Sequence, residues 1–581
     1  MSAFLGIEHS LTGRRWAGPS IETARKAEMI AQRTPLPVPL CNTLARLGVP
    51  AIEAETYLKP KLRDLMPDPK KLNDMDVAVR RFLTAVEKKE KIAIFADYDV
   101  DGACSAALVF DWLRQMDISA TIYIPDRIDE GYGPNEAAMS RLAESHDLII
   151  CVDCGTQANT AIDAAIGADV IVLDHHLGGE VLPNAVAVVN PNRHDESGEL
   201  SHLCATAVVF LVLVAVERSL RASGRFGPDL MNMLDLVALA TVADVVPLTG
   251  VNRAFVHAGL HLMSKRRRPG LAALSDIAKI ERSPSSHHLG FVLGPRINAG
   301  GRVGRADLGA RLLTCVNLDE AQSLAEMLDR YNDERRQIQN DVTASAMIHI
   351  SSMDPCEPIV WAAKEGWHPG VVGIVASRIK EAANRPAIVI GLNGDVGKGS
   401  GRSVPGIDLG FAIQKLVAED LLIKGGGHRM AAGMTVHKSK LEAAMERLSE
   451  IVASQQAGKR ERPSLDVDGL LMPDGATQEL VKQIESAGPY GSAAREPCFA
   501  FPNMKISFTR RVSESHMQIR FSDGVGTGID GIAFGAYDGK LGTALENHGG
   551  DRFHLAGKIG INSFRGKNSV QMQLIDAANA I

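Results

Sequence analysis

Residues 91–102, Lys91-Ile92-Ala93-Ile94-Phe95-Ala96-Asp97-Tyr98-Asp99-Val100-Asp101-Gly102, decide the fold of this chain. The apolar run Ile92–Phe95 predicts a buried strand, and the helical stretch Ala103–Met116 follows the acidic turn. Further strands are expected at Ala120–Ile124, Leu148–Val152, Val170–Leu173 and Ala185–Val189. Continuous apolar strands that alternate with helices are typical of a parallel sheet covered on both faces. The acidic turn should therefore lie at the carboxyl edge of such a sheet, where α/β proteins build their sites.

The bulk composition is that of a multidomain globular protein. At roughly 100–200 residues per domain, 581 residues predict three or four domains. A net charge of -6 excludes a globally basic nucleic-acid coat, so a polyanion would have to bind to local patches. The start of the chain has no apolar signal region, and the longest apolar run, Cys204–Val216, is too short to span a bilayer and predicts a buried helix. Eight thinly spread cysteines suggest reduced thiols, so we expect a cytoplasmic protein without a membrane segment.

Changes in pattern along the chain divide it into five parts and a linker. Residues 1–90 mix short helical patterns with proline-rich turns and are expected to form an adaptor segment, and strand–helix alternation occupies 91–317. Residues 318–350 predict one long charged helix that connects to a second α/β unit at 351–453. A polar stretch at 453–463 predicts a linker. Alternating apolar and polar residues in 465–581 indicate a small antiparallel barrel or sandwich.

Carboxylates and imidazoles recur where successive elements end. After the turn with Asp97, Asp99 and Asp101 come Asp153, then Asp174-His175-His176, then Asp244. The turn alone is equally well explained as an acidic helix cap, because Asp favours helix N-termini. The recurrence favours a site at one edge that holds Mn²⁺ or Mg²⁺, and two such ions can activate a water and stabilise the leaving oxygen of a phosphoester.

Two other motifs have ordinary explanations. Cys151 and Cys154 have the spacing of a redox pair or half a zinc site, but no second pair completes four ligands, and Cys151 is expected in the core. The basic run Lys265-Arg266-Arg267-Arg268 predicts a solvated face, with a DNA-backbone contact as the alternative.

These motifs, in this order, resemble those of the DHH phosphoesterase superfamily. Within it the chain is similar to bacterial single-strand-specific 5′→3′ exonucleases, through the further motifs Gly294–Arg302, Gly366–Ile374, Gly399–Ser403 and Gly425–His428. The match runs from about Ile92 to Gly433 and continues more weakly to the C-terminus. It implies an α/β fold: a parallel-sheet DHH domain, a connecting helix, a smaller α/β DHH-associated domain and a C-terminal OB-like barrel.

The resemblance also implies roles for individual residues. Metal ligands would be Asp97, Asp99, Asp101, Asp153, His175 and Asp244. Catalytic positions would be His176 on the scissile phosphate, Asp174 orienting the histidines, His368 and Arg302. A pocket for the terminal 5′-phosphate would contain Arg127, Ser400 and Arg402. Nucleic-acid contacts would come from Arg296, Asn298, Gly426, His428, Arg511 and Arg520.

Several of these positions have simpler structural explanations. Arg127 could form a surface salt bridge with neighbouring acids, and His368 could cap or pack. The Gly294–Arg302, Gly399–Ser403 and Gly425–His428 motifs are expected to be glycine-rich loops, where glycine permits close approach to a ligand. The family's Gly-x-Gly-Asn-Pro-Glu-Pro motif is replaced here by Gly491–Pro497, which puts contacts of that loop in doubt.

The function implied is two-metal hydrolysis of single-stranded DNA from the 5′ end to 5′-mononucleotides, in DNA recombination and repair. Alternatives are a DHH phosphodiesterase that acts on oligoribonucleotides, cyclic dinucleotides or pyrophosphate, and a non-catalytic single-strand-binding scaffold. Such hydrolases are typically shorter and lack the barrel, whereas a scaffold would be expected to have lost ligands. Single-strand-binding protein and a RecQ-type helicase are implied as partners, and the family suggests a monomer.

Overall fold

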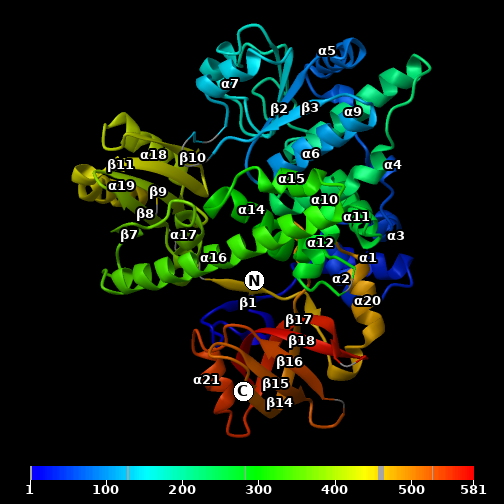
Figure 1. The fold of residues 1–581 in the computed structure, drawn as a ribbon. Helices are drawn as coiled ribbons and strands as arrows, with labels where there is room; N and C mark the ends of the chain where they lie inside the picture. The colour runs from blue at the N-terminus through cyan, green and yellow to red at the C-terminus, as the bar shows by residue number, and fades with distance from the viewer. Residues whose placement is uncertain are drawn as a thin grey trace.

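The structure is a computed structural model that describes residues 3–126, 130–131, 133–281, 283–455, 463–526, 528–564 and 566–580. Two α/β lobes and a helical region lie on one side of a long helix, and a β-barrel lies on the other (Figure 1). The first 90 residues contain α1 (Ile21–Arg33), α2 (Val38–Arg46), α3 (Ala54–Leu58), α4 (Leu62–Leu65) and α5 (Met75–Lys88). Within the described residues, no helix combines the length and apolar character needed to cross a bilayer.

The first lobe is built on the predicted parallel sheet. Its strand order is β3-β2-β4-β5-β6, and all neighbouring pairs are parallel. The strands are β2 (Ile92–Ala96), β3 (Ala120–Tyr123), β4 (Leu148–Val152), β5 (Asp169–Leu173) and β6 (Ala187–Val189). Every residue of β2 and β4 is buried, as their unbroken apolar pattern predicts. Because β3 and β4 flank β2 on opposite sides, the chain reverses direction across the sheet there, which opens the sheet's carboxyl edge to a ligand.

Helices cover both faces of this sheet. Ile92 and Ile94 face the core that contains α5, α6 (Val100–Gln115) and α9 (Ala205–Ala222), whereas Ala93 and Phe95 face α7 (Glu136–Ala143) and α8 (Asn159–Asp163). The apolar run at 204–216 is thus a buried helix, as predicted. The remaining helices of the region are α10 (Leu234–Ala243), α11 (Gly250–Ser264), α12 (Pro269–Ile277), α13 (Ser286–His288), α14 (Gly294–Val303) and α15 (Leu308–Thr314).

The long connecting helix is confirmed as α16, Leu318–Ser351. Its N-terminal half packs on the first core through Leu324 and Leu328, and its C-terminal half packs on the second lobe through Val342 and Ala346. One unbroken helix therefore joins the two cores.

The second lobe has the strand order β10-β11-β9-β8-β7. Its elements are β7 (Val360–Glu365), α17 (Val372–Ala383), β8 (Ala387–Asn393), β9 (Val396–Arg402), α18 (Leu409–Ala418), β10 (Lys424–His428), β11 (Ala431–His437) and α19 (Leu441–Gln455). The expectation of glycine-rich loops was wrong here, since Gly399–Arg402 and Gly425–His428 lie in strands. A Cβ at Gly399 would lie 2.8 Å from Ile390, so the absence of a side chain serves core packing. Part of the predicted linker, 456–462, lies outside the described residues.

The Gly294–Arg302 motif is also not a loop. It forms the helix α14, which follows a π-helical turn at Leu289–Leu293. A Cβ at Gly301 would lie 2.8 Å from the side chain of Tyr98, so this glycine lets the helix approach the acidic turn. Arg296, Asn298 and Arg302 therefore project from a helix beside that turn.

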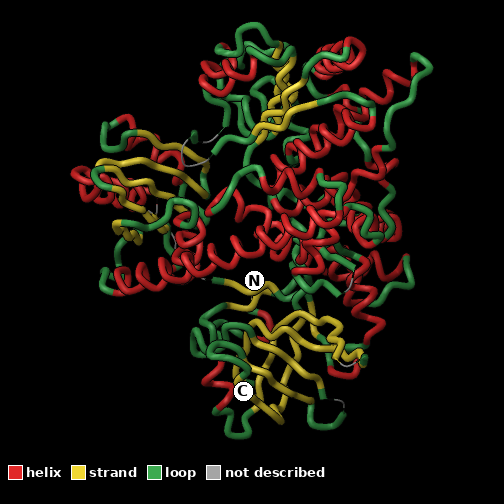
Figure 2. Tube along the Cα trace, in the orientation of Figure 1, coloured by secondary structure: helices red, strands yellow, loops and turns green. Residues whose placement is uncertain are grey.

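The C-terminal region is a closed barrel, as the resemblance implies. Neighbouring strands pair in the order β14-β15-β16-β18-β17, and β14 also pairs with β17, which closes the ring (Figure 2). The strands are β13 (Gly469–Leu470), β14 (Phe499–Arg511), β15 (Met517–Ser522), β16 (Ile529–Ala533), β17 (Arg552–Phe564) and β18 (Lys567–Asn579), with helices α20 (Gln478–Ser486) and α21 (Leu541–Glu546). Alternate residues Met517, Ile519 and Phe521 fill its core.

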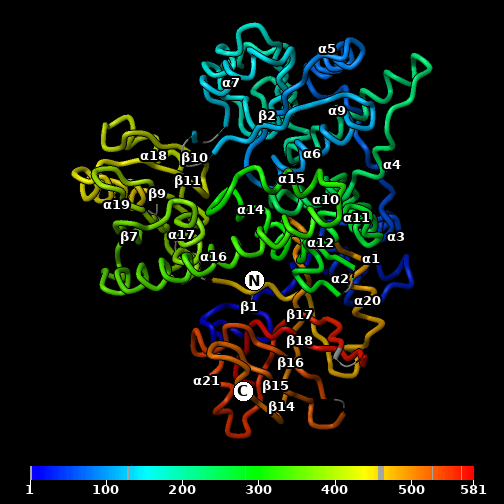
Figure 3. The backbone as a smooth tube through the Cα atoms, viewed as in Figure 1, coloured from blue at the N-terminus to red at the C-terminus, as the bar shows by residue number. Residues whose placement is uncertain are grey.

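The N-terminal segment is attached to this barrel (Figure 3). Strand β1 (Arg15–Ala17) pairs in parallel with β12 (Ser464–Asp466), and the buried indole of Trp16 donates a 3.0 Å hydrogen bond to Asp576. The altered Gly491–Pro497 loop contacts the first lobe, because Leu248 N–H donates to the carbonyl of Ser492.

The basic run at 265–268 is only partly a solvated face. Arg266 and Arg267 are exposed, but the side chain of Arg268 is 11% exposed and forms 2.7 Å ion pairs with both Asp111 and Asp235. The prediction was wrong for Arg268 because two carboxylates from distant helices neutralise it, which the local sequence does not reveal.

We expect Arg268→Met to destabilise the protein strongly. Removing the guanidinium would leave Asp235 buried without its counterion and Asp111 with Arg114 alone, at a cost of about 3–5 kcal/mol. Thermal melting followed by circular dichroism measures the loss. The exposed neighbour supplies the control: Arg267→Gln should change the free energy of unfolding by less than about 0.5 kcal/mol. Equal melting temperatures for the two variants would contradict the buried ion-pair assignment.

Candidate metal centre and nucleic-acid-binding site

The acidic turn joins β2 to α6 at the carboxyl edge of the first sheet. Asp99 is the N-cap of α6, where its Oδ1 accepts hydrogen bonds from Asp101 N–H (2.9 Å) and Gly102 N–H (3.1 Å). The helix-cap explanation is thus correct for Asp99, and it does not exclude a ligand role for the other oxygen. Asp101 is buried and receives 2.7 and 2.8 Å hydrogen bonds from the N–H groups of Ala205 and Thr206, at the start of α9.

Asp153 occupies the position after β4, directly beside this turn. It is 1% exposed, and its φ of 58° places a non-glycine residue in the left-handed region. Its Oδ1 is buried and accepts no hydrogen bond from any described residue. A buried carboxylate oxygen without a donor is costly, and a bound cation is the usual way to satisfy it.

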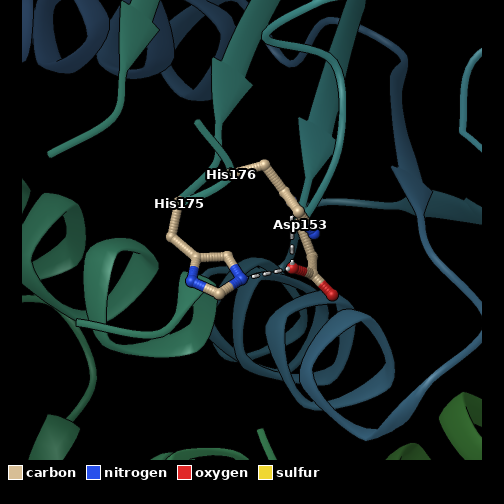
Figure 4. Close-up of side chains that lie close together, drawn as sticks. All are labelled: Asp153, His175 and His176. Carbon is tan, nitrogen blue, oxygen red and sulfur yellow. Dashed lines mark ion pairs between the residues drawn. The ribbon is translucent and has the colours of Figure 1, made fainter. Parts of the chain in front are cut away.

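The two histidines after β5 face this carboxylate (Figure 4). The Nε2 of His175 lies 3.4 Å from Oδ1 of Asp153 and 3.8 Å from Oδ2 of Asp101, and its Nδ1 lies 3.7 Å from Oδ2 of Asp244. The Nδ1 of His176 lies 3.9 Å from Oδ1 of Asp153. His175 is therefore at the centre of the carboxylates.

Three sets of side chains each have ligand atoms within 4.8 Å of one another. The sets are Asp153–His175–His176, Asp101–His175–Asp244 and Asp97–Asp99–Asp153. All six residues predicted as metal ligands fall in these sets, and so does His176, which was predicted to contact phosphate instead. Asp153 belongs to two sets and His175 to two, so shared ligands can hold more than one ion.

The carboxylates destabilise one another's charged forms. Burial, together with Asp101, Asp99, Asp97 and Asp244, raises the pKa of Asp153 well above its usual range. Burial and the charges of Asp101 and Asp99 raise the pKa of Asp244 to about 8. Divalent cations with oxygen and nitrogen ligands would neutralise this cluster, so its donor atoms fit Mn²⁺ or Mg²⁺.

Asp174 belongs to none of these three sets, and its charged form is stabilised. Although it is buried, hydrogen bonds from His176 and from the Thr156 N–H lower the pKa of Asp174. Burial opposes protonation of His176, but its 2.8 Å hydrogen bond to Asp174 raises the pKa of His176 to about 9. Asp174 thus orients the imidazole and favours its protonated form, consistent with the orienting role predicted for it.

Several supporting residues were not predicted from the sequence. The amide of Asn190 donates to the carbonyl of His176 (2.8 Å), and the amide of Asn192 donates to the carbonyl of His175 (2.6 Å). Both follow β6, the next parallel strand. They could have been predicted by examining the polar residues that follow each strand of this sheet. Thr206, which donates a 2.6 Å hydrogen bond to Asp101, gives no such local signal.

Arg302 and His368 lie at the junction of the two lobes. Arg302 donates a 3.0 Å hydrogen bond to the carbonyl of Gly370, across the two lobes. The Nδ1 of His368 accepts from the N–H of Gly370 (3.1 Å) in the turn before α17, and the N-cap of that helix, Val371, has no side-chain cap. The junction brings the second lobe against the helix that carries Asn298.

The predicted phosphate pocket is only partly described. Arg402 donates to the hydroxyl of Ser400 (3.0 Å) and to the carbonyl of Gly401 (2.9 Å), and it contacts no carboxylate among the described residues. Burial lowers the pKa of Arg402. A Cβ at Gly373 would lie 3.1 Å from both side chains, so this glycine leaves room around them. Arg127 lies outside the described residues.

The remaining lobe residues take different positions. Asn298 accepts a 3.0 Å hydrogen bond from the Val100 N–H and so supports the acidic turn. Arg296 points to α16, where it pairs with Asp329 at 2.8 Å. Gly426 and the exposed His428 lie on the edge strand β10.

The barrel residues lie apart from the metal cluster. Arg511 stacks over the ring of Tyr537 at 4.0 Å and donates to the carbonyl of Glu514, while Arg520 pairs with Asp530 at 3.4 Å. Phe521 is core, as the alternation predicts, whereas Phe508 is 45% exposed.

Comparison with known families and structures identifies the parts of the chain. Residues 91–241 match the DHH family, N-terminal domain, residues 356–454 match the DHHA1 domain, and residues 467–576 match the RecJ OB domain. The chain is 35% identical over 575 residues to the single-stranded-DNA-specific exonuclease RecJ of Salmonella typhimurium, with 95% of this chain and 98% of that protein covered.

Solved structures agree. RecJ from Thermus thermophilus in complex with Mn²⁺ superposes with a TM-score of 0.80 at 26% identity, over 97% of this chain and 79% of that one. Its complex with Mg²⁺ gives a TM-score of 0.74 at 24% identity, over 97% and 78%. With three matching domains in the same order and identity of this extent, the chain belongs to the RecJ family of single-stranded-DNA-specific exonucleases.

Proposed function

We propose that this protein is a metal-dependent exonuclease that degrades single-stranded DNA in the 5′→3′ direction and releases 5′-mononucleotides, in recombination and repair. The observation that supports this most strongly is the cluster around Asp153: two of the three sets of candidate ligand atoms include this residue, and its buried Oδ1 accepts no hydrogen bond from a described residue. Mn²⁺ or Mg²⁺ bound there would lower the pKa of an attacking water and stabilise the leaving oxygen of a phosphodiester.

The side chains divide the remaining work. With Nδ1 of His176 hydrogen-bonded to Asp174 and its pKa raised to about 9, the protonated ring would donate from Nε2 to an oxygen of the scissile phosphate. Asp174 would orient this ring, and Asn298 would hold the acidic turn in place.

Directionality would come from Ser400 and Arg402, together with Arg127. A guanidinium that contacts no described carboxylate suits a dianionic terminal phosphate, because Arg binds phosphate through two parallel hydrogen bonds. A pocket that accepts only a terminus would make the enzyme begin at the 5′ end.

The alternative functions are less well supported. A phosphodiesterase for oligoribonucleotides or cyclic dinucleotides would not need the barrel at 467–576. A non-catalytic scaffold would not need the complete set of candidate ligands.

The cysteines and the family indicate the compartment, the oligomeric state and the partners of the protein. All eight cysteines are free thiols, which favours the reducing cytoplasm. A monomer that acts with single-strand-binding protein and a RecQ-type helicase is consistent with the family. The domain limits 1–90, 91–317, 318–350, 351–453 and 465–581 stay predictions.

The proposal is tested by digesting one single-stranded oligonucleotide labelled at either end, with Mn²⁺ or with chelator. We expect immediate release of labelled mononucleotide from the 5′ label alone, abolished by chelator. A duplex of the same sequence serves as the control and should resist digestion. Intact DNA together with turnover of a cyclic dinucleotide would refute the substrate, and early release from the 3′ label would refute the direction.

A further inference from the structure

Three parts of the chain meet around the side chain of Arg253. This residue lies on α11, which packs in the core of the first lobe, and it is 2% exposed. Its Nη2 donates hydrogen bonds to the carbonyls of Gly488 (2.6 Å) and Ala487 (3.3 Å), directly after the end of α20. Its guanidinium lies over the ring of Tyr57, in α3 of the N-terminal segment, at 3.9 Å. One buried cation therefore joins the first lobe to the N-terminal segment and to the chain around α20.

No carboxylate among the described residues forms an ion pair with Arg253. Its buried Nε has no described hydrogen-bond partner, and burial lowers the pKa of Arg253. Its counter-charges are only partial, because they are the negative end of the α20 dipole and the electron-rich face of the Tyr57 ring. The buried Arg268 differs, since it contacts both Asp111 and Asp235. Neutral groups from other parts of the chain therefore hold Arg253 in its desolvated position.

The chain that follows α20 receives further hydrogen bonds from the same side. The hydroxyl of Ser286 donates to the carbonyl of Tyr490 (2.7 Å), and the N–H of Leu248 donates to the carbonyl of Ser492 (2.9 Å). We call residues 487–492 the barrel joint. Its last residues begin the loop in which this sequence departs from the family motif, so the altered loop still contacts the first lobe.

The barrel joint connects the surroundings of the metal cluster to the barrel. On one side, Leu248 lies on the segment that follows the candidate ligand Asp244. On the other side, α20 packs into the barrel core through Leu480 and Ile484. Figure 1 shows α20 between the helical region and the barrel. The direction of α20 therefore determines where the barrel lies relative to the metal cluster.

This relative position affects how tightly a long strand can bind. A strand that is held at two places gains affinity, because binding at the first place confines it near the second. The gain decreases when the distance and direction between the two places vary. A guanidinium restricts such variation well, since its donors have fixed directions.

We propose that Arg253 is a positioning residue, which fixes the barrel relative to the metal cluster and thereby sets the affinity for DNA strands long enough to contact both. The proposal rests on the function proposed above and deepens it, because it names a residue that determines which strand lengths are bound tightly. Arg253 is buried and acts through the barrel joint, not through contact with DNA.

The test compares Arg253→Gln with the wild-type full-length protein on 5′-phosphorylated single strands of increasing length, starting from a dinucleotide. Equilibrium binding in chelator and turnover with Mn²⁺ are measured at each length. We expect the affinity of wild type to rise with length until the strand reaches the barrel. Arg253→Gln should bind long strands roughly tenfold more weakly, with KM raised by the same factor, because it loses part of the gain from the second contact. The dinucleotide should be bound and turned over as by wild type, and kcat should be unchanged at every length.

Three further variants control for charge and folding. Arg253→Lys keeps the charge without the fork that reaches two carbonyls, so it should restore part of the affinity for long strands. Ser286→Ala removes one hydrogen bond of the barrel joint without removing a buried charge, and it should give a smaller loss of the same kind. Arg221→Gln, at an exposed position in the same lobe, should behave as wild type.

The dependence on strand length decides the outcome. An affinity that rises with length in Arg253→Gln as steeply as in wild type would overturn the proposal, and so would an equal loss on the dinucleotide. An affinity of wild type that does not rise with length would also overturn it. If Arg253→Gln does not fold, the same comparison with Ser286→Ala decides. If wild type binds DNA without degrading it, the proposed function fails, and the length dependence of binding in chelator still decides for or against Arg253.

Discussion

Replacing Asp153 by asparagine should lower the rate of DNA cleavage roughly 10³-fold and, at the same time, raise the melting temperature of the metal-free protein. The clustered carboxylates destabilise the folded protein when no cation is present, because burial and four other carboxylates raise the pKa of Asp153. A group with a raised pKa in the folded state stabilises the fold at low pH and loses that contribution as pH rises through the folded value. At neutral pH the neutral amide avoids this loss, so we expect an increase of a few degrees.

The same substitution removes a ligand shared by two metal-capable sets. Loss of about 4 kcal/mol of transition-state stabilisation corresponds to a rate roughly 10³-fold lower. Adding Mn²⁺ should raise the melting temperature of wild type and leave that of the variant nearly unchanged, which reports metal binding independently of activity. Asp163→Asn, at an exposed position in the same lobe, should behave as wild type. A variant that Mn²⁺ still stabilises would show that Asp153 is not a ligand.

Replacing Arg402 by glutamine should remove the preference for a 5′-phosphorylated end. Arg402 and Ser400 would bind the terminal phosphate through charge-assisted hydrogen bonds, and losing about 2–3 kcal/mol lowers kcat/KM roughly 100-fold. A 5′-hydroxyl strand never makes those bonds, so its kcat/KM should change less than about threefold. The ratio of the two substrates is the measurement, since a folding defect would lower both.

Two variants sharpen this result. Arg402→Lys retains the charge without the planar fork and should restore only part of the preference. Arg385→Gln removes a half-buried arginine of the same lobe that donates to the carbonyls of Asp354 and Glu357, and it should retain all of the preference. If Arg402→Gln lowers kcat/KM equally for both substrates, Arg402 supports the sheet and does not bind the terminal phosphate.

The sequence predicted this architecture where local pattern and tertiary structure agree. The apolar run at Ile92–Phe95 needed a buried parallel strand, and the acids after it had to lie at its carboxyl edge. Five of the six candidate ligands came together because strands β2, β4 and β5 end at the same edge of the sheet, and Asp244 joins them from the C-terminal end of α10.

Predictions failed where the same residue type serves two purposes. Glycine indicated loops at Gly301 and Gly399, whereas each lacks a side chain because Tyr98 or Ile390 packs against its backbone. Arg268 looked like its exposed neighbours until the fold placed Asp111 and Asp235 around it. Such contacts join residues far apart in the chain, and no local pattern records them.

The contact between the N-terminal segment and β18 has a consequence for when the barrel completes its folding during synthesis. The N–H of Leu11 donates to the carbonyl of Ala577, and the indole of Trp16 donates to Asp576. During synthesis from the N-terminus, Leu11 and Trp16 gain these two hydrogen-bond partners only after β18 has been translated. The contact between residues 11–16 and the barrel therefore forms only after the two lobes and the helix α16 between them have been translated.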